Sequence, residues 1–389
     1  MKITNRFFVF VFLCLLAILP AYPQTPNQKF LVFVGTYTEK TDSKGIYAYE
    51  FDASTGKLAP KGLAAGSSNP SWLAIHPNGK WAYAANESGK QSSISAFSTD
   101  AKSAKLTLLN QLPAFGEDPC YLSFDKTGKY LFVANYTSGN VVVFPILPDG
   151  KLGEHTSSMQ DGGVLGPNKE RQEAPHAHWI EPSIDGHGVY VADLGLDRLL
   201  TYRFDTSNGT LNGAPLSSYT RYKNAWSVPV NPGDGPRHAV FGANDHIYVL
   251  GEVQSAVTGI VLDYHTDIEP VQRISTIPTD YKGRNDAAEI ALHPSGKWLF
   301  TSNRGHDSIT VFSVDPATGK LELAGDYSTG GKEPRHFALD PTGKFLLAEN
   351  QNSNSIVVFR INPESGALSQ ISITEGIPSP VCLTFLRTP

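Results

Sequence analysis

The stretch GPRHAVFGANDHIYVLGE, residues 235–252, contains a Pro-Arg-His corner, a short strand, a turn, a second short strand and a terminal glutamate. Six other parts of the chain are variants of this pattern. A unit that recurs along a chain is typical of repeat architectures, in which each copy buries its apolar face against its neighbours. The repeat therefore decides the fold, and each copy can be compared with the others.

The turn inside the repeat is conspicuous in four copies, which read HPNGK at His76, DKTGK at Asp125, HPSGK at His293 and DPTGK at Asp340. A proline at the second position fixes its own φ, and the later glycine accepts a positive φ, so these segments favour hairpins. A third strand follows each hairpin. We expect a weaker fourth strand after the glycines at positions 56, 150, 209, 319 and 366. Four antiparallel strands per unit are typical of a propeller blade.

Counting the strands gives the number of blades. First strands are expected after Pro70, Pro119, Pro175, Pro236, Ala287, Pro334 and Pro380, and second strands near Leu31, Trp81, Tyr130, Val189, His246, Trp298 and Phe345. The chain thus enters at a second strand and ends on a first strand. We predict an all-β, seven-bladed β-propeller of four-stranded antiparallel blades, closed by the C-terminal strand pairing into the first blade, as a single domain over residues 25–389. Closure removes a free sheet edge.

The N-terminus precedes this domain. Lys2 and Arg6 flank the start of an apolar run from Phe7 to Pro20, which ends in Ala-Tyr-Pro-Gln. This order of charge, apolar run and small residue is typical of a secretory signal, and the run is short for a membrane span. We predict a signal peptide over residues 1–24, export to the periplasm or medium, and no stable membrane insertion after cleavage.

The composition limits the partners. The 389 residues are 40% hydrophobic and 18% charged, with 32 Lys and Arg against 37 Asp and Glu. Such a balance indicates no attraction to nucleic acid or to an anionic membrane. We expect a monomer that acts on a small molecule. Beyond the signal, Cys120 and Cys382 fall at the start of predicted inner strands, where burial as reduced residues is expected.

When the seven repeats are aligned, the residues at two positions of the repeat are expected to lie at the same end of the central channel, which we call the mouth of the ring. Each of these positions forms one column of the alignment. The residues that follow the corner proline are Ser71, Cys120, His176, Arg237, Ala288, Arg335 and Val381; those that end the second strand are Tyr37, Glu87, Tyr136, Leu194, Glu252, Arg304 and Gln351. Near the first column lie His178, His238, Glu289 and His336. Any one of these side chains could serve only to hydrogen-bond a neighbouring blade, but the charged ones gather in blades four to seven. That asymmetry favours a site on one side of the mouth.

The residue types at this mouth indicate a reaction class. Arginines suit a carboxylate or phosphate, while a glutamate or histidine could move a proton during attack of water on a carbonyl. The set fits hydrolysis or cyclisation at a carbonyl of an anionic substrate. His176 and His178 with Glu252 or Glu289 could ligate a metal, but nearby arginines disfavour a cation. We therefore expect neither a metal site nor another cofactor.

A family resemblance rests on FVGTYT at Phe33, APHAH at Ala174, VADLGLDR at Val191, GDGPRH at Gly233, SNRGHDSI at Ser302 and EPRHFALDPTGK at Glu333. These motifs resemble the bacterial lactonase family of seven-bladed propellers. That family includes cycloisomerase-type 6-phosphogluconolactonases and is similar to fungal carboxy-cis,cis-muconate cyclase. The resemblance implies a metal-independent lactonase or lactonising enzyme. It implies catalytic roles for His176, Arg237, Glu252 and Arg304, with Arg335 as an additional candidate.

We therefore predict an exported enzyme that hydrolyses a sugar lactone, resembling 6-phosphogluconolactonase. Glu252 would orient or deprotonate water, His176 would assist proton transfer, and Arg237 and Arg304 would hold the acidic group. Residues expected to bind the substrate are His178, His238, Glu289, Arg335 and His336. Two alternatives remain open at this stage: a lyase or isomerase of a carbohydrate-derived acid, as in the muconate cyclase, and an exported propeller that binds without catalysis.

Overall fold

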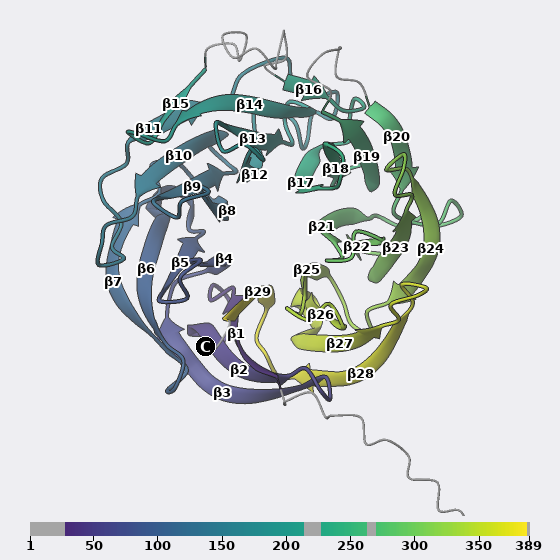
Figure 1. Ribbon diagram of the computed structural model, residues 1–389, viewed down its shortest axis with the longest axis horizontal. Coiled ribbons are helices and arrows are strands. Elements are labelled where there is room, and N and C mark those ends of the chain that lie inside the picture. The colour runs from purple at the N-terminus through teal and green to yellow at the C-terminus, as the bar shows by residue number, and fades with distance from the viewer. Residues whose placement is uncertain (1–27, 214–226, 263–269, 387–389) are drawn as a thin grey trace, which may run out of the picture.

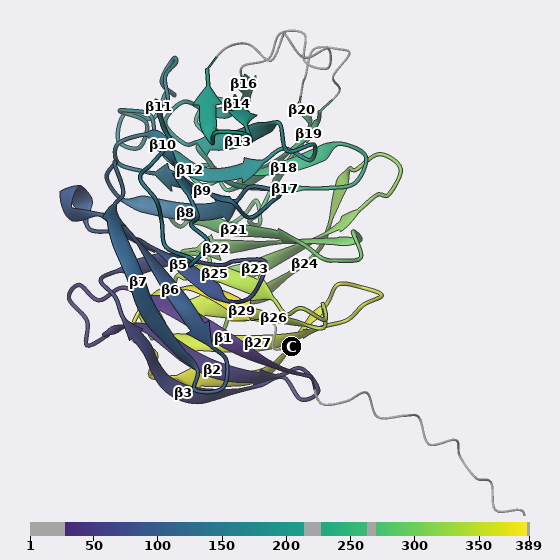
Figure 2. The same cartoon turned by 60° about the vertical axis from the view of Figure 1, so that its left-hand side comes forward.

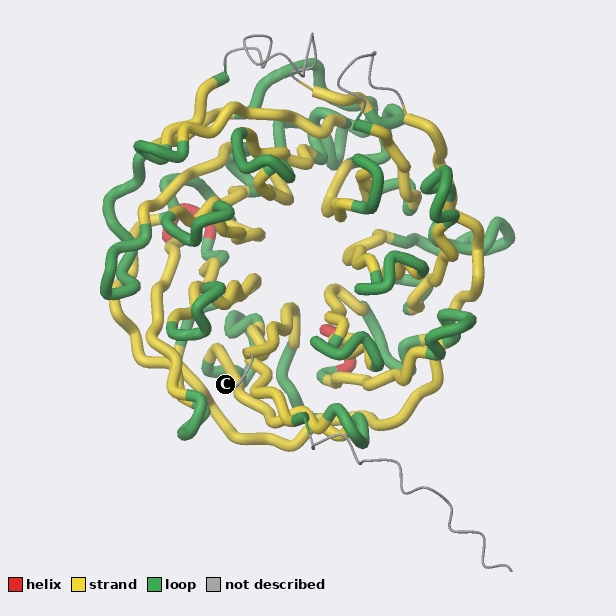
Figure 3. The backbone as a smooth tube through the Cα atoms, in the orientation of Figure 1, coloured by secondary structure: helices red, strands yellow, loops and turns green. Residues whose placement is uncertain are grey.

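The computed structural model describes residues 28–213, 227–262 and 270–386, and the predicted signal peptide over residues 1–24 lies outside them. In these residues seven antiparallel sheets surround a central axis, each with four strands in sequence from the axis outward (Figure 1). The blade of β12 carries an additional strand, β16, beside β14. Within the described ranges the backbone is almost entirely strand and loop, with two short 3₁₀ helices at Gly89–Gln91 and Gln351–Ser353 (Figure 3).

The strands of blades one to four have the following bounds. Blade one contains β29 (Pro380–Leu386), β1 (Lys29–Thr36), β2 (Gly45–Asp52) and β3 (Lys57–Gly66); blade two contains β4 (Pro70–Ile75), β5 (Trp81–Asn86), β6 (Ser93–Asp100) and β7 (Lys105–Pro113). Blade three contains β8 (Pro119–Phe124), β9 (Tyr130–Asn135), β10 (Asn140–Pro145) and β11 (Ser157–Gln160); blade four contains β12 (Ala177–Pro182), β13 (Gly188–Asp193), β14 (Arg198–Asp205), β15 (Thr210–Asn212) and β16 (Ser227–Pro229).

The remaining blades follow in the same order. Blade five contains β17 (Pro236–Phe241), β18 (His246–Gly251), β19 (Ala256–Val261) and β20 (Pro270–Ser275); blade six contains β21 (Asp286–Leu292), β22 (Trp298–Arg304), β23 (Ser308–Val314) and β24 (Leu321–Ser328); blade seven contains β25 (Pro334–Leu339), β26 (Phe345–Asn350), β27 (Ser355–Ile361) and β28 (Leu368–Glu375). Figure 2 shows the outer strands β3 and β7 crossing the outside of the ring.

The ring closes between the two ends of the chain, as predicted. β29 pairs antiparallel with β1, and Leu31 lies opposite Leu386. Packing between blades seven and one supports this closure, because the rings of Phe51 and Phe345 meet edge to face with centroids 5.5 Å apart. Each such fully buried aromatic side chain stabilises the fold by about 1.5–3 kcal/mol. The core is therefore a circle of apolar contacts between neighbouring blades.

The seven first strands and seven second strands of the sequence prediction are confirmed, and two details were wrong. The fourth strand of blade three was expected after Gly150, but the structure has only a single bridge there, between Ile146 and Leu152, and forms the strand at Ser157–Gln160. The inner strand of blade four was expected directly after Pro175 and begins at Ala177. Within the described ranges, no helix is long and apolar enough to cross a membrane.

Candidate active site

One extra residue near the start of each inner strand shapes the mouth of the ring. In blade five, Pro236 lies opposite Gly251 and His238 opposite Leu250, so that Arg237 is left over as a β-bulge. The same register shift occurs in every other blade. A bulge bends its strand and re-aims a side chain. The repeat thus turns one residue per blade out of the regular pairing at the same end of the ring.

The strand pairing in blade four shows that the sequence alignment chose the wrong residue for the first column, the position that follows the corner proline. Ala177 lies opposite Asp193 and Trp179 opposite Ala192, so the left-over residue is His178 and not His176. His176 instead precedes the strand, where its carbonyl accepts the Leu194 N–H, as the Gly235 carbonyl accepts that of Glu252. The error came from aligning Pro175 with the corner prolines. Alignment on the turn glycine would have identified Ala177, and not Pro175, as the counterpart of the corner prolines. Gly79 follows Pro70 by nine residues, and Gly186 follows Ala177 by nine.

Glu252 is the centre of charge at the mouth. It follows β18 directly and is 5% exposed. Its Oε2 atom lies 3.0 Å from Arg237 Nε and 3.2 Å from Arg304 Nη2, and its Oε1 atom accepts a hydrogen bond from Arg171 Nη2. Burial would raise the pKa of Glu252, but Arg304, Arg237 and Arg171 outweigh burial and hold the pKa well below its ordinary value. Glu252 is therefore a permanent carboxylate held by three arginines.

The three arginines differ in what else they do. Arg237 is 3% exposed and donates from Nη1 to the Ala288 carbonyl; its contact with Glu252 is an ion pair without hydrogen-bond geometry, since Nε has no hydrogen-bond partner among the described residues. Burial, followed by the charge of Arg304, lowers the pKa of Arg237 to about 10. Arg304 is fixed by its Nε donating to the Asp286 carbonyl at 3.2 Å. Arg237 thus lies behind Glu252, whereas Arg304 faces the mouth.

Arg171 was missed by the sequence analysis. It lies in the long connection between β11 and β12, which no other blade shares, so the repeat alignment offered no column in which to compare it. Its side chain is 30% exposed and bridges Glu252 to Asp286, with Nη1 3.3 Å from Asp286 Oδ1. Asp286 also pairs with Arg284 at 2.6 Å. No signal in the repeat marked this loop beyond its length.

These residues surround a cavity of about 290 Å³, which we call the mouth cavity. Its walls are formed by Tyr37, Glu87, Cys120, Tyr136, Arg171, His178, Glu252, Arg284, Asp286, Arg304 and Arg335. On the side away from Glu252, Arg335 lies over the ring of Tyr37 at 5.4 Å, and the Tyr37 hydroxyl donates to Glu87 Oε2 at 2.8 Å. The volume is close to the lower bound of small-molecule pockets, about 300–1,000 Å³.

The two candidate histidines of blade four have different surroundings. His176 stacks on Tyr136 with centroids 4.5 Å apart, and its ring nitrogens lie near the Tyr136 carbonyl and Glu173, so it does not line the mouth cavity. His178 does line it, and its Nδ1 atom is buried without a hydrogen-bond partner among the described residues. Burial, then Arg237 and His238, hold the pKa of His178 well below its ordinary value. His178 is therefore neutral at physiological pH.

Of the other predicted binding residues, Arg335 lines the mouth cavity, whereas His238, Glu289 and His336 lie behind its walls. His238 Nδ1 is 3.0 Å from Glu289 Oε1, and His336 lies between Glu289, at 3.5 Å, and Glu349, at 2.5 Å. The His238 ring also packs edge-on against Trp72 and Tyr121, with centroids 5.3 and 5.1 Å away. The structure thus brings His238, Glu289 and His336 together as a buried network that supports the mouth from beneath.

The geometry also bears on two other kinds of catalysis, by a cysteine nucleophile and by a metal ion. Burial raises the pKa of the Cys120 thiol well above its ordinary value, so this cysteine of the mouth cavity stays protonated and is a poor nucleophile. Within the described residues, no group of three or more His, Cys, Asp or Glu side chains is arranged to hold a metal ion. What the cavity offers instead is the guanidinium groups of Arg171, Arg284, Arg304 and Arg335, the carboxylates of Glu87, Glu252 and Asp286, and the neutral imidazole of His178.

Comparison with known proteins identifies the family. Residues 31–385 match the lactonase family, described as a seven-bladed β-propeller. The chain belongs to this family. It is 35% identical over 363 residues to a 6-phosphogluconolactonase of Bacillus subtilis, covering 92% of this chain and 99% of that protein. It is 32% identical over 316 residues to a 6-phosphogluconolactonase of Formosa agariphila, covering 79% and 85%.

Among solved structures, the chain resembles the periplasmic gluconolactonase of Pseudomonas aeruginosa with a TM-score of 0.84 and 31% identity. The match covers 93% of this chain and 100% of the Pseudomonas aeruginosa chain. Relatives named as lactonases therefore share both the fold and nearly its full length.

Proposed function

We propose that this protein hydrolyses a sugar lactone in the mouth cavity and resembles 6-phosphogluconolactonase in its reaction. The observation that carries the proposal is the fork of three arginines around the buried carboxylate of Glu252, beside a neutral histidine in a cavity of about 290 Å³. Family membership and relatives named as lactonases support the reaction class. A lactone ring needs little more than an activated water and a stabilised oxyanion to open.

The proton acceptor in this proposal is His178. A general base must be unprotonated at the working pH, and the lowered pKa of His178 meets this condition. Its imidazole would take a proton from water as the water oxygen bonds to the lactone carbonyl carbon. When the bond between that carbon and the ring oxygen breaks, the proton would pass to the ring oxygen. The product is an open-chain sugar acid with a new hydroxyl, and its carboxyl group then ionises to a carboxylate and releases the second proton of the water to solvent.

Glu252 has a different part in the reaction from the one expected from sequence. Its strongly lowered pKa makes it a weak base, so we assign it to holding Arg304 and Arg171 in place and offsetting their charge. Arg304 would bind the developing oxyanion, and Arg171 and Arg335 would bind any acidic group of the substrate. Arg237 supports Glu252 from behind. His176, which stacks on Tyr136, would position that wall of the cavity.

The direct test is a panel of aldonolactones, with and without a phosphate group, read by proton release. The wild type is expected to open at least one of them faster than buffer, and Glu252→Gln to lose most of that rate. A wild type that opens none and binds none would overturn the proposal. A wild type that opens one while Glu252→Gln matches it would leave the reaction standing and remove Glu252 from it.

We further propose that the protein is exported. The basic and apolar N-terminal segment supports this, as does the similarity to a gluconolactonase that is periplasmic. Fractionation of cells that express the full chain should place it outside the cytoplasm, shortened by about the 24 residues of the predicted signal. Recovery of the uncut chain from the cytoplasm would contradict export without touching the proposed reaction.

A further inference from the structure

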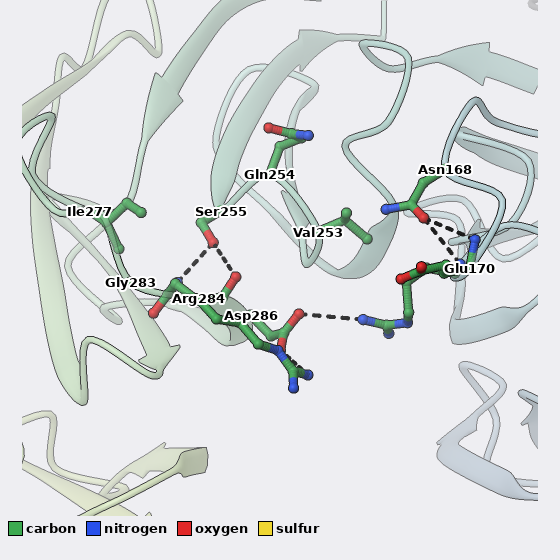
Figure 4. Close-up of a pocket in the computed structure, with 11 residues that line it drawn as sticks. Asn168, Glu170, Val253, Gln254, Ser255, Ile277, Gly283, Arg284 and Asp286 are labelled. Carbon is green, nitrogen blue, oxygen red and sulfur yellow. Dashed lines mark hydrogen bonds and ion pairs between the residues drawn. The ribbon is translucent and has the colours of Figure 1, made fainter.

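A second and larger cavity, of about 670 Å³, lies beside the mouth cavity, and we call it the side chamber. Three segments enclose it: the loop around Asn168–Arg171, the residues after β18 from Val253 to Ser255, and those from Gly283 to Asp286, which lead into β21 (Figure 4). Arg171, Arg284 and Asp286 line both cavities. The two spaces are therefore neighbours that share one wall.

The shared wall is built from side chains. Asp286 receives Arg171 on one oxygen and Arg284 on the other, and the Arg284 side chain is 85% exposed. Asp286 itself is buried, but an ion pair to so exposed an arginine contributes little stability, about 0–1 kcal/mol, so the Arg284 side chain is easily displaced by a ligand. A substrate whose reacting group sits beside Glu252 can thus extend past Asp286 into the side chamber.

Beyond the shared wall, the side chamber is lined by polar amide groups, an apolar surface and the carboxylate of Glu170, which can accept a hydroxyl. The Gln254 side chain is exposed, and its amide has no hydrogen-bond partner among the described residues. Asn168 uses its Oδ1 atom to accept the backbone N–H groups of Glu170 and Arg171, which leaves its Nδ2 donors facing no described acceptor. Val253 and Ile277 add an apolar surface. Unengaged amides beside an apolar wall suit hydroxyls and C–H groups.

A third cavity, of about 500 Å³, borders the mouth on the opposite side and differs in this respect. Two of its polar residues hold loops together: Asn69 accepts the N–H groups of Thr38 and Glu39 and donates to the Glu87 carbonyl. Asp118 accepts the Gly89 N–H and the Thr137 hydroxyl. The amide of Asn69 and the carboxylate of Asp118 are thus already engaged, unlike the amide of Gln254 in the side chamber.

We propose that the side chamber is a subsite for a neutral, hydroxyl-rich extension of the substrate, so that the enzyme accepts the lactone of a disaccharide acid. This inference rests on the proposed function, since it takes the mouth cavity as the place where the lactone opens. The second sugar ring would lie between Gln254, Asn168 and Ile277. The Arg171–Asp286 wall would be the point at which the chain of the substrate crosses from one cavity to the other.

The test compares two lactones that share one reacting ring: glucono-1,5-lactone and lactobionolactone, which carries a galactosyl group on the same ring. The wild type is expected to show a kcat/KM about tenfold higher for the disaccharide, the gain from roughly one or two added hydrogen bonds. Gln254→Trp, which fills the side chamber, should remove this preference and leave the monosaccharide rate within about twofold. Ser88→Trp, a matched change at the opposite cavity, should keep the preference.

The outcomes separate the two proposals. Equal rates on both lactones, or a preference that survives Gln254→Trp, would overturn the side chamber while leaving the lactonase reaction intact. Failure to open either lactone would count against the proposed function alone. In that case calorimetry with lactobionate and gluconate decides the subsite: tighter binding of lactobionate that Gln254→Trp abolishes supports it, and equal or undetectable binding of both overturns it.

Discussion

Glu252 and Glu87 occupy the same position in two blades, and their surroundings make them different residues. Each follows the second strand of its blade directly, and each lines the mouth cavity. Glu252 is held by Arg171, Arg237 and Arg304. Glu87 is half-buried, accepts one hydrogen bond from Tyr37 and makes no ion pair with an arginine in the described residues. Position in the repeat sets where each carboxylate points, and the neighbouring blades set what it can do.

The difference follows from which side chains the adjacent blades bring to the rim. Blade six brings Arg304 to Glu252, and the loop before blade four adds Arg171. Beside Glu87, blade three contributes the protonated thiol of Cys120, and blade one contributes Tyr37. A closed, nearly symmetric scaffold therefore carries an asymmetric site. The predictions below change one side of this comparison at a time.

The largest effect is expected from Glu252→Gln. Loss of the carboxylate leaves three arginines without their shared partner, so the donors for the oxyanion lose their geometry and kcat/KM should fall by about 10²–10³-fold. The free energy of unfolding should also fall, by about 3 kcal/mol, because Arg237 remains buried without its counter-charge. Chemical denaturation and lactone kinetics on the same preparation check both effects. A fully active variant would place the chemistry elsewhere.

The second effect distinguishes the two histidines of blade four. His178→Gln should lower kcat by about 10²-fold, since the general base is lost, whereas His176→Gln should lower it by less than about fivefold. Single-turnover kinetics separate this from changes in binding. The reverse order would show that the residue before the strand, and not the bulged one, performs the proton transfer.

The pH profile tests the same assignment without mutation. His178 acts only when neutral, and burial with Arg237 lowers its pKa, so activity is retained as the pH falls to about 6.5 and is lost only below that, through the lowered pKa. We expect kcat/KM to be flat above about pH 6.5 and to fall tenfold per pH unit once the pH is below the pKa of His178. A midpoint above pH 6.5 would indicate a different base.

Arg171 should affect binding more than chemistry. Arg171→Ala removes the arginine that bridges Glu252 and Asp286 from a loop found in blade four alone, so KM should rise by about tenfold while kcat changes by less than about threefold. Lys169→Ala, on the same loop but absent from the walls of both cavities, serves as the control. A fall in kcat with unchanged KM would instead place Arg171 at the oxyanion.

The smallest effect on kcat/KM is expected from Glu87→Gln. Glu87→Gln keeps an oxygen that can accept the Tyr37 hydroxyl, so kcat/KM should stay within about threefold of the wild type. Steady-state kinetics on the preferred lactone are sufficient. A loss as large as that of Glu252→Gln would mean that both carboxylates act together.

Much of the fold could be predicted because its turns repeat. The turn glycines, the alternating strands and the entry of the chain at a second strand were enough to give seven blades and their closure. The errors have physical causes. Pro175 resembled a corner proline, and alignment on it shifted blade four by two residues, which placed His176 where the structure has His178.

The candidate site was predictable only where it belongs to the repeat. Arg237, Glu252, Arg304 and Arg335 were found because siblings in other blades defined their columns. Arg171 has no sibling, and its contact with Glu252 depends on how a long loop folds across the rim. The sequence also could not show which of the predicted side chains line the cavity. Arg237, His238, Glu289 and His336 lie behind the cavity wall, since the bulge aims some side chains outward and their neighbours inward.

The central claim is that the arginine-held carboxylate, and not the mouth in general, makes this propeller a lactonase. The most direct measurement is proton release from the preferred lactone by the wild type, Glu252→Gln and Glu87→Gln, all confirmed as folded. The account predicts that Glu252→Gln retains about 1% or less of the wild-type kcat/KM while Glu87→Gln remains close to it. Equal activity in the two variants would contradict it.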